Sequence, residues 1–430
     1  MKILFLTPGT GSYYCGACMR DNILARELLR LGHEVTIAPM YLPLMIDDTK
    51  LPGLEQTPIF FGGINVYLQQ KVPLFRKTPA FFDKLLNARG LLRWAARHSH
   101  MTSAREHGEM TLEMLDIESA PFHKESEKLF GWLEQSSSPD LVCLSNALLA
   151  GFAPEMKRRL SAPVITFFQG EDSFLDGLPD PWKTQCWTRM AQRLADSAAR
   201  LAPSRYYADF MHERLAPNPG VIDVVPNGIR LEDFPVGAPP AQPTIGYFAR
   251  ITRDKGAELF VEAFIHLATT LGDKTARARI GGAATAGDQP LVDTLQRRLA
   301  AAGLADRVTW SLNLAREEKL AFLQSLSLFS VPVLYREAFG LYTIEAMACG
   351  VPIVQPDASA FPEIVAGGGG LCVPPKDARA LATEWQGLLA DEPRRRALGA
   401  AARLDVEKRF SAGTMAAQFL AVAERLRVPA

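Results

Sequence analysis

The sequence predicts an α/β fold with two consecutive domains, each built on a doubly wound parallel sheet. Three observations support this prediction. The chain has 430 residues, more than one hydrophobic core usually holds. Short apolar segments alternate with helical segments, which is typical of parallel strands joined by helices. This alternation stops near residue 234 and restarts near residue 244.

The first domain is predicted to cover residues 1–235. Apolar segments expected to be strands lie at residues 2–8, 34–40, 139–146, 162–170 and 199–204. A Gly-rich turn and a helix ending near His33 join the first two. The region 41–138 has a weaker pattern, because residues 62–70 alternate like a strand and residues 81–97 have helical spacing despite Gly90. We expect this region to be an irregular or helical insertion.

The second domain is predicted to cover residues 244–412. Residues 236–243 are rich in Pro, Gly and Ala and have no periodicity, so they are expected to be a linker. Strands are expected at residues 244–250, 276–282, 307–312, 328–335 and 351–357, each followed by a helix or a short turn. An amphipathic segment at residues 413–430 is expected to form the last helix.

Composition narrows the classes of partner. Forty-seven basic residues balance 47 acidic ones, so we expect no overall attraction to nucleic acid. The first strand is too short for a secretory signal, and no apolar run of about 18 residues is found, as a membrane span would need. Six scattered cysteines do not resemble a disulfide framework. We therefore expect a cytoplasmic protein with reduced thiols.

The segment GYFARITRDKG (246–256) places two cations where a strand gives way to a helix. Arg250 follows the strand, and Lys255 lies at the start of the next helix. Helix N-termini and fixed positive charges both favour anionic oxygens, so this arrangement suits a diphosphate. A solvated surface loop is the alternative interpretation of this segment taken alone.

A second segment, REAFGLYTIEAMACG (336–350), contains two carboxylates. Glu337 precedes a Phe-Gly turn, and Glu345 falls in about the first turn of the helix that follows. A carboxylate can accept hydrogen bonds from two vicinal sugar hydroxyls, and the backbone N–H groups of Gly340 and Leu341 can face phosphate or sugar oxygens. The alternative for Glu345 is helix capping, because acidic residues complement the helix dipole.

Five segments occur in the order seen in one enzyme family. They are VVPNGI (224–229), GYFARITRDKG (246–256), IGGA (280–283), EAFGLYTIEAMACGVPIV (337–354) and FPEIV (361–365). The fourth resembles the Glu-x7-Glu signature of the retaining nucleotide-sugar glycosyltransferases of family 4. The resemblance covers essentially the whole second domain, the start of the first domain and the joint between them.

This resemblance implies the GT-B fold, in which two Rossmann-like domains face each other across a cleft and the last helix crosses back to the first domain. It also implies a nucleotide-sugar donor, an unidentified acceptor hydroxyl and no metal or other cofactor. Arg250 and Lys255 would stabilise the leaving diphosphate, Glu337 would contact the donor sugar and Glu345 the ribose. An isomerase similar to nucleotide-sugar 2-epimerases, or a non-catalytic nucleotide-sugar binder, is the alternative.

The acceptor side is expected in the first domain. The Gly-rich turn at residues 8–22 includes Gly11, which by the resemblance approaches the diphosphate. Cys15 and Cys18 in this turn lack the second pair that a zinc site needs, so we interpret them as small packed residues. Gln169 replaces a histidine that many family members carry, and it cannot titrate near neutral pH. The adjacent Glu171 and Asp172 are either acceptor contacts or solvated loop carboxylates.

A basic segment at residues 75–97 completes the set of candidates. It has six basic residues and one acidic residue, a local charge of +5. Arg89, Arg93 and Arg97 recur every four positions and would form one cationic stripe on a helix. Peripheral contact with the inner face of a membrane, an anionic acceptor, or packing on the protein's own domain would each explain this pattern.

Overall fold

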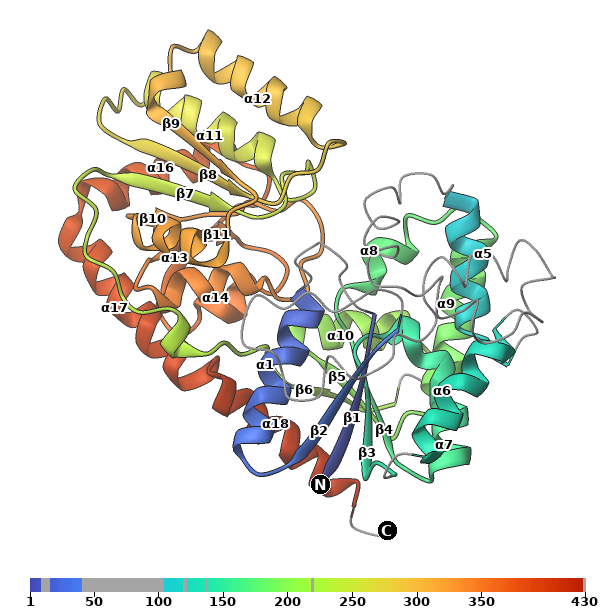
Figure 1. Ribbon diagram of the computed structural model, residues 1–430. Coiled ribbons are helices and arrows are strands. Elements are labelled where there is room, and N and C mark those ends of the chain that lie inside the picture. Colours follow the sequence, from blue (N-terminus) through green and yellow to red (C-terminus); the bar gives the residue numbers. More distant parts are fainter. Residues whose placement is uncertain (9–15, 41–103, 119–121, 136–137, 218–219, 428–430) are drawn as a thin grey trace. The chain divides into compact units, whose positions relative to one another are not determined.

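The computed structural model describes residues 1–8, 16–40, 104–118, 122–135, 138–217 and 220–427 (Figure 1). These residues form two compact units. Unit 1 contains residues up to 203, residues 207–225 and the C-terminal residues from 415 onward. Unit 2 contains residues 204–206 and 226–414. The strand expected at residues 62–70 and the helix expected at residues 81–97 lie outside the described residues.

Unit 1 is built on a six-stranded sheet in the order β2-β1-β3-β4-β5-β6, and all neighbouring strands are parallel. The strands are β1 (Lys2–Thr7), β2 (Glu34–Pro39), β3 (Leu141–Leu144), β4 (Val164–Phe167), β5 (Ala199–Ala202) and β6 (Ile222–Val224). The strand order reverses between β1 and β3. Ligands of doubly wound proteins bind at such a switch point, outside the carboxyl ends of the strands.

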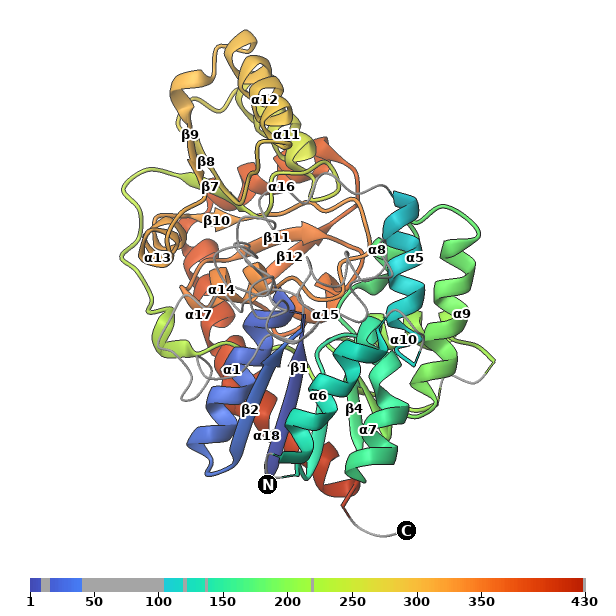
Figure 2. The same ribbon diagram turned by 45° about the vertical axis from the view of Figure 1, so that its right-hand side comes forward.

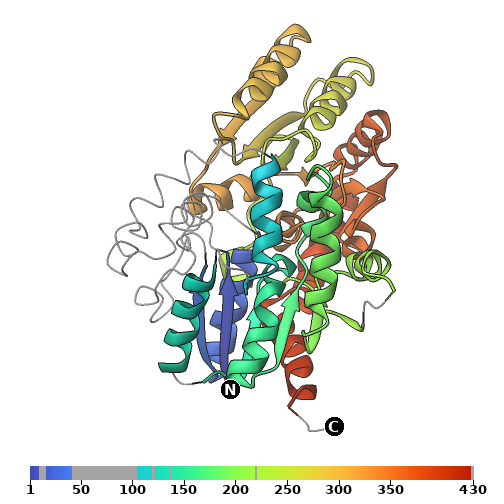
Figure 3. The ribbon, with the colours of Figure 1, turned by 90° about the vertical axis from the view of Figure 1, so that its right-hand side faces the viewer.

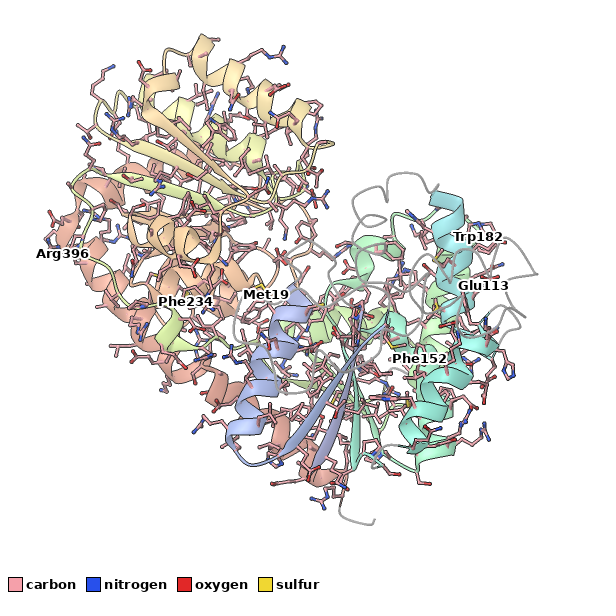
Figure 4. All side chains as sticks on the ribbon, in the orientation of Figure 1. Met19, Glu113, Phe152, Trp182, Phe234 and Arg396 are labelled. Atoms are coloured by element: carbon pink, nitrogen blue, oxygen red, sulfur yellow. The ribbon has the colours of Figure 1, made fainter. Side chains whose placement is uncertain are left out.

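Helices cover both faces of this sheet (Figures 1 and 2). They are α1 (Gly16–Arg30), α5 (Ala104–Met114), α6 (His123–Gln135), α7 (Ala153–Leu160), α8 (Glu171–Leu175), α9 (Trp182–Leu194), α10 (Arg205–Arg214), α18 (Ala412–Arg425) and the 3-10 helix η3 (Ala147–Phe152). Figure 3 shows α5, in cyan, beside the green α9, and the two helices are in contact. Phe152, labelled in Figure 4, is fully buried at the end of η3.

Alternate residues of β1 contribute to two separate hydrophobic cores. Leu4 and Leu6 of β1 pack in a cluster with residues of α6 and α7, whereas Ile3 and Phe5 pack in a cluster with residues of α1 and α18. Phe419 of α18 lies 6.3 Å from Phe5, measured between ring centroids. A parallel sheet buried on both faces requires this apolar run along every strand, which is why the strands can be recognised in the sequence.

Unit 2 has a second six-stranded parallel sheet, in the order β12-β11-β10-β7-β8-β9. The strands are β7 (Thr244–Phe248), β8 (Arg277–Gly282), β9 (Val308–Leu312), β10 (Leu328–Phe329), β11 (Ile353–Pro356) and β12 (Gly370–Val373). The chain adds β8 and β9 on one side of β7 and then returns to the other side. The switch point of this sheet therefore lies between β7 and β10.

The helices of unit 2 follow its strands. They are α11 (Ala257–Thr269), α12 (Gln289–Ala301), α13 (Arg316–Gln324), α14 (Leu341–Ala348), α15 (Phe361–Val365), α16 (Ala378–Ala390) and α17 (Glu392–Arg409), with the 3-10 helices η4 (Leu231–Asp233) and η5 (Ala305–Arg307). An aromatic chain joins the sheet to two of them: Tyr247 of β7 contacts Phe260 of α11 with ring centroids 5.4 Å apart, and Phe260 contacts Trp385 of α16 at 5.0 Å.

The predicted fold class, two doubly wound α/β domains, is confirmed. One expected strand is much shorter than predicted, because β10 ends at Phe329 and not near residue 335. Proline at position 332 has no N–H group for a strand partner, and the N–H of Val331 donates to the side chain of Gln355 at 3.1 Å.

Strands β6 and β12 were not predicted. Residues 236–243 contain no helix or strand.

No described helix is both long and apolar enough to cross a membrane.

Candidate functional site

The loop between β7 and α11 carries both predicted cations, and a buried tyrosine fixes it. The hydroxyl of Tyr247 lies 3.2 Å from the backbone oxygens of Arg250 and Lys255 and donates toward both. Tyr247 is fully buried, and this burial, with a smaller effect of Asp254, raises its pKa well above the ordinary value. The phenol therefore stays protonated and holds both ends of the loop.

The loops that follow β7 and β10 touch each other at the switch point of unit 2. Gly256 has a φ of 73°, and a Cβ atom at this position would lie 1.8 Å from the backbone oxygen of Pro332. Only glycine permits both this conformation and this approach. The N–H of Leu334 also donates to the backbone oxygen of Asp254 at 2.7 Å. These contacts bring Lys255 to the loop that carries Glu337.

Lys255 and Glu337 form the centre of the site. The Lys255 Nζ lies 2.6 Å from Glu337 Oε2, and the two side chains are 21% and 12% exposed. The hydroxyls of Tyr335 and Tyr342 donate to the same Oε2 at 2.7 and 2.8 Å. Lys255 also donates to the Tyr335 hydroxyl. Three side chains, from the β7–α11 loop, the β10–α14 loop and α14, thus converge on one carboxylate oxygen.

Arg250 does not join this cluster. Its side chain is 58% exposed and lies 3.5 Å from Asp288 Oδ1. Asp288 also accepts hydrogen bonds from the backbone N–H and hydroxyl of Thr285, at 2.8 and 2.7 Å. Burial alone would raise the pKa of Asp288, but the Thr285 bonds and the charge of Arg250 outweigh burial and lower it. Arg250 is therefore an accessible cation with a loosely held partner.

Glu345 has a different partner, Lys319 of α13. The Lys319 Nζ lies 2.7 Å from each carboxylate oxygen, and the two side chains are 18% and 3% exposed. Glu345 is the fifth residue of α14, so its expected place in the first turn is wrong, and so is the interpretation as a helix cap. The cap is Gly340, with a φ of 86° and no side-chain hydrogen bond. Leu341 is the first residue of the helix, so its N–H group belongs to the positive end.

In unit 1, Glu171 and Asp172 are buried, with 4% and 2% exposure. The alternative that they are solvated loop carboxylates is therefore wrong. Glu171 accepts hydrogen bonds from the N–H groups of Ala147 and Gln169, both at 2.9 Å, and Asp172 accepts one from the Tyr207 hydroxyl at 2.8 Å. Burial raises the pKa of Glu171 despite these bonds. Within the described part of the chain, the buried Nε2 of Gln169 has no hydrogen-bond partner.

A buried ion pair in the second turn of α1 was not predicted from the sequence. Arg20 Nη2 lies 2.8 Å from Asp21 Oδ1 and donates to the backbone oxygen of Ser145 at 2.9 Å. The guanidinium carbon lies 3.6 Å from the ring centroid of Phe167. Cys18 is buried beside this pair, with its sulfur 3.3 Å from the Thr7 hydroxyl. These residues lie at the carboxyl ends of β1, β3 and β4.

Three of the predicted features fall outside the described residues. They are Gly11 and Cys15 in the Gly-rich turn and the basic segment at residues 75–97. The structure also adds three residues near the predicted site that the sequence did not single out. Tyr335 and Tyr342 lie within or beside the quoted Glu-x7-Glu segment, but Lys319 is separated from Glu345 by 26 positions and no sequence signal joins them.

Both units match known protein families. Residues 22–228 match the family model of the glycosyl transferase 4-like domain, and residues 229–405 match that of glycosyl transferases group 1. The chain therefore contains two glycosyltransferase domains, which together span residues 22–405. The predicted resemblance to glycosyltransferases is confirmed at this level, and assignment to family 4 itself stays a prediction.

Curated relatives agree with these domains. The lipopolysaccharide core biosynthesis mannosyltransferase LpsB of Rhizobium meliloti is 34% identical over 195 residues, which cover 44% of this chain and 54% of that protein. The GDP-mannose-dependent alpha-(1-6)-phosphatidylinositol monomannoside mannosyltransferase of Mycolicibacterium smegmatis is 32% identical over 169 residues, 38% of this chain and 42% of that protein. The chain thus spans about half the length of these relatives.

Solved structures share this fold. Sucrose-phosphate synthase from Thermosynechococcus elongatus matches with a TM-score of 0.72 and 18% identity, covering 99% of this chain and 98% of that chain. Anabaena HepE in complex with UDP matches with a TM-score of 0.67 and 17% identity, covering 99% and 100%. Each unit is therefore a Rossmann-like domain of the GT-B type.

Proposed function

We propose that the protein transfers a sugar from a nucleoside diphosphate donor to an acceptor hydroxyl and retains the anomeric configuration. The observation that carries this proposal is the ion pair of Lys255 and Glu337, 2.6 Å apart at the switch point of unit 2. A cation, a carboxylate and the first N–H groups of α14 follow two neighbouring strands there. Recognition of a sugar diphosphate needs these three kinds of group.

Lys255 would bind a phosphate oxygen of the donor. An ammonium group has three hydrogens, and the described residues accept hydrogen bonds from two of them, through Tyr335 and Glu337. Arg250 would exchange Asp288 for the same diphosphate, because its present pairing is exposed and long. Both cations would stabilise the negative charge that grows on the leaving diphosphate more than they stabilise the bound donor.

The reaction follows a front-face course in this proposal. The bond between the anomeric carbon and the diphosphate oxygen breaks, and the acceptor oxygen forms its bond on the same face. The departing phosphate oxygen takes the acceptor proton. Glu337 would hold donor sugar hydroxyls and Glu345 the ribose hydroxyls. In this scheme Lys319 keeps the buried Glu345 carboxylate in place.

The first donor to test is GDP-mannose, because one relative is named for dependence on it and another is named a mannosyltransferase. UDP-glucose is the second, because HepE has been solved with UDP and with UDP-glucose. Release of nucleoside diphosphate is measured with each donor, first without acceptor and then with a panel of glycan, lipid and small-molecule hydroxyl acceptors. The sugar product is analysed by NMR for anomeric configuration and for epimerisation.

Variants connect any turnover to the site. Lys255→Ala and Glu337→Ala should each lower kcat by about 10²–10³-fold, as expected for loss of a group that stabilises the transition state. Arg396→Ala, on the exposed side of α17, is the control, with a side-chain exposure of 65%. Wild-type protein that neither binds nor consumes any nucleotide sugar would overturn the proposal. Interconversion of the donor sugar without transfer would favour an isomerase.

A further inference from the structure

Glu337 Oε2 receives more hydrogen bonds than one carboxylate oxygen usually accepts. Lys255, Tyr335 and Tyr342 donate to it at 2.6, 2.7 and 2.8 Å. A carboxylate oxygen offers about two lone-pair directions, so three donors saturate it. No described residue donates to the other oxygen, Oε1. The two oxygens of this carboxylate are therefore unequal before any ligand arrives.

We propose that Tyr335 and Tyr342 are positioning residues that hold Glu337 by Oε2, so that Oε1 is presented to a hydroxyl of the donor sugar. This inference rests on the proposed function. It goes beyond that function by naming the two phenols, and by assigning different roles to the two carboxylate oxygens.

Lys255 alone could not fix Glu337 during the reaction. Its ammonium group sits on a flexible stem and is the group assigned to the diphosphate, so its position changes with the ligand. The tyrosines have only two rotatable side-chain bonds and lie on different segments, Tyr335 in the β10–α14 loop and Tyr342 in α14. They would keep Glu337 in place when Lys255 also binds a phosphate.

The Tyr342 phenol stays protonated, and so remains a donor, over a wide pH range. Burial raises the pKa of Tyr342 well above its ordinary value, and the nearby charge of Glu337 adds to this effect. Lys255 Nζ lies over both rings, 4.7 Å from the centroid of Tyr335 and 5.4 Å from that of Tyr342. The rings thus contact the cation while their hydroxyls contact the carboxylate.

The backbone of Glu337 is held as firmly as its side chain. The Glu337 N–H donates to the Ser359 hydroxyl at 3.1 Å, and the Ala360 N–H donates to the Glu337 backbone oxygen at 3.3 Å. Ser359 has a φ of 60°, a conformation that non-glycine residues rarely adopt. Backbone and side chain together leave Glu337 little freedom to reorient.

The test compares Tyr335→Phe, Tyr342→Phe and the double variant with wild type. Each single change should lower kcat with the nucleotide sugar by about tenfold, as loss of one hydrogen bond to a charged group predicts. Affinity for the nucleoside diphosphate without sugar should stay within about twofold. In a Glu337→Gln background, the tyrosine changes should have little further effect, because the group that they hold is already altered.

Val292→Ala is the control for general destabilisation, because this buried side chain lies on α12, a segment that carries none of the residues around Glu337. If the wild type is active and the tyrosine variants have the same kcat as Val292→Ala, the inference is wrong but the proposed function stands. Equal losses of affinity for the nucleoside diphosphate and the nucleotide sugar would also overturn it, since they would indicate a general structural role. A wild type without binding or turnover would overturn the proposed function, and the inference with it.

Discussion

Replacing Lys319 with Met should destabilise unit 2 strongly, because it would leave a buried carboxylate without its cation. Glu345 is 3% exposed, and both of its oxygens lie 2.7 Å from the Lys319 ammonium group. Methionine keeps most of the aliphatic stem and removes the charge. The variant therefore isolates the cost of an unpaired buried charge from the cost of lost packing.

The expected magnitude follows from this burial. Breaking a buried ion pair by removing one partner costs about 3–5 kcal/mol, whereas a solvent-exposed pair contributes about 0–1 kcal/mol. Lys319 keeps 18% exposure, so water can partly solvate the remaining carboxylate. We expect the lower end, about 3 kcal/mol. For a unit of this size, each kcal/mol shifts Tm by roughly 2–4 °C, which gives a decrease of about 6–12 °C.

Thermal unfolding followed by circular dichroism, without ligand at neutral pH, measures this change. Arg396→Met is the matched control, because Arg396 pairs with Glu392 at 2.6 Å but the two side chains are 65% and 55% exposed (Figure 4). This control should shift Tm by less than about 3 °C. The double variant Lys319→Met/Glu345→Leu should recover much of the lost stability, since an apolar pair replaces the ion pair. Equal shifts in Lys319→Met and Arg396→Met would refute the reasoning.

Three further predictions concern single contacts. Gly256→Ala should lower the free energy of unfolding, measured in urea, by more than about 2 kcal/mol, because Gly256 has a positive φ and a Cβ atom there would clash with Pro332. The control Gly387→Ala lies in open space on α16 and should be neutral or stabilising. The pKa of Glu171 is raised in the folded protein, which therefore binds more protons than the unfolded chain. Wild-type stability should fall as pH rises from about 4.5 through the folded pKa, and Glu171→Gln should remove this part of the pH dependence. Identical pH profiles of stability for the variant and the wild type would contradict the prediction. Tyr247→Phe should lower the free energy of unfolding in urea by about 1–2 kcal/mol and weaken diphosphate binding measured by calorimetry. Unchanged diphosphate affinity would show that the loop does not need the Tyr247 hydroxyl.

Much of the fold could be predicted from the sequence because both sheets are buried on two faces. Strands such as β1 and β7 are continuous apolar runs, and helices separate them. The prediction failed where strands were too short to show a pattern. Strand β6 has three residues, and β10 has two before the chain leaves the sheet near Pro332. Here pairing with neighbours, and not local sequence, decides where a strand ends.

The candidate site was only partly predictable. Lys255 and Glu337 could be proposed as neighbours because each follows a strand at the carboxyl end of one sheet, and the structure brings them together. Arg250, proposed for the same place, pairs with Asp288 instead. Which side chain an exposed arginine meets depends on its rotamer and on the next loop, and the sequence encodes neither in a local pattern.

By itself, the sequence determined the two-domain α/β architecture and the two carboxylates on either side of the Phe-Gly turn, because apolar periodicity and turn residues are local properties. Only the tertiary structure decided the partners of those carboxylates. The loop of Lys255 meets Glu337 because Gly256 allows a close approach to Pro332, and α13 brings Lys319 to Glu345. Such pairings depend on the packing of segments distant in sequence, so they emerge only when the chain is folded.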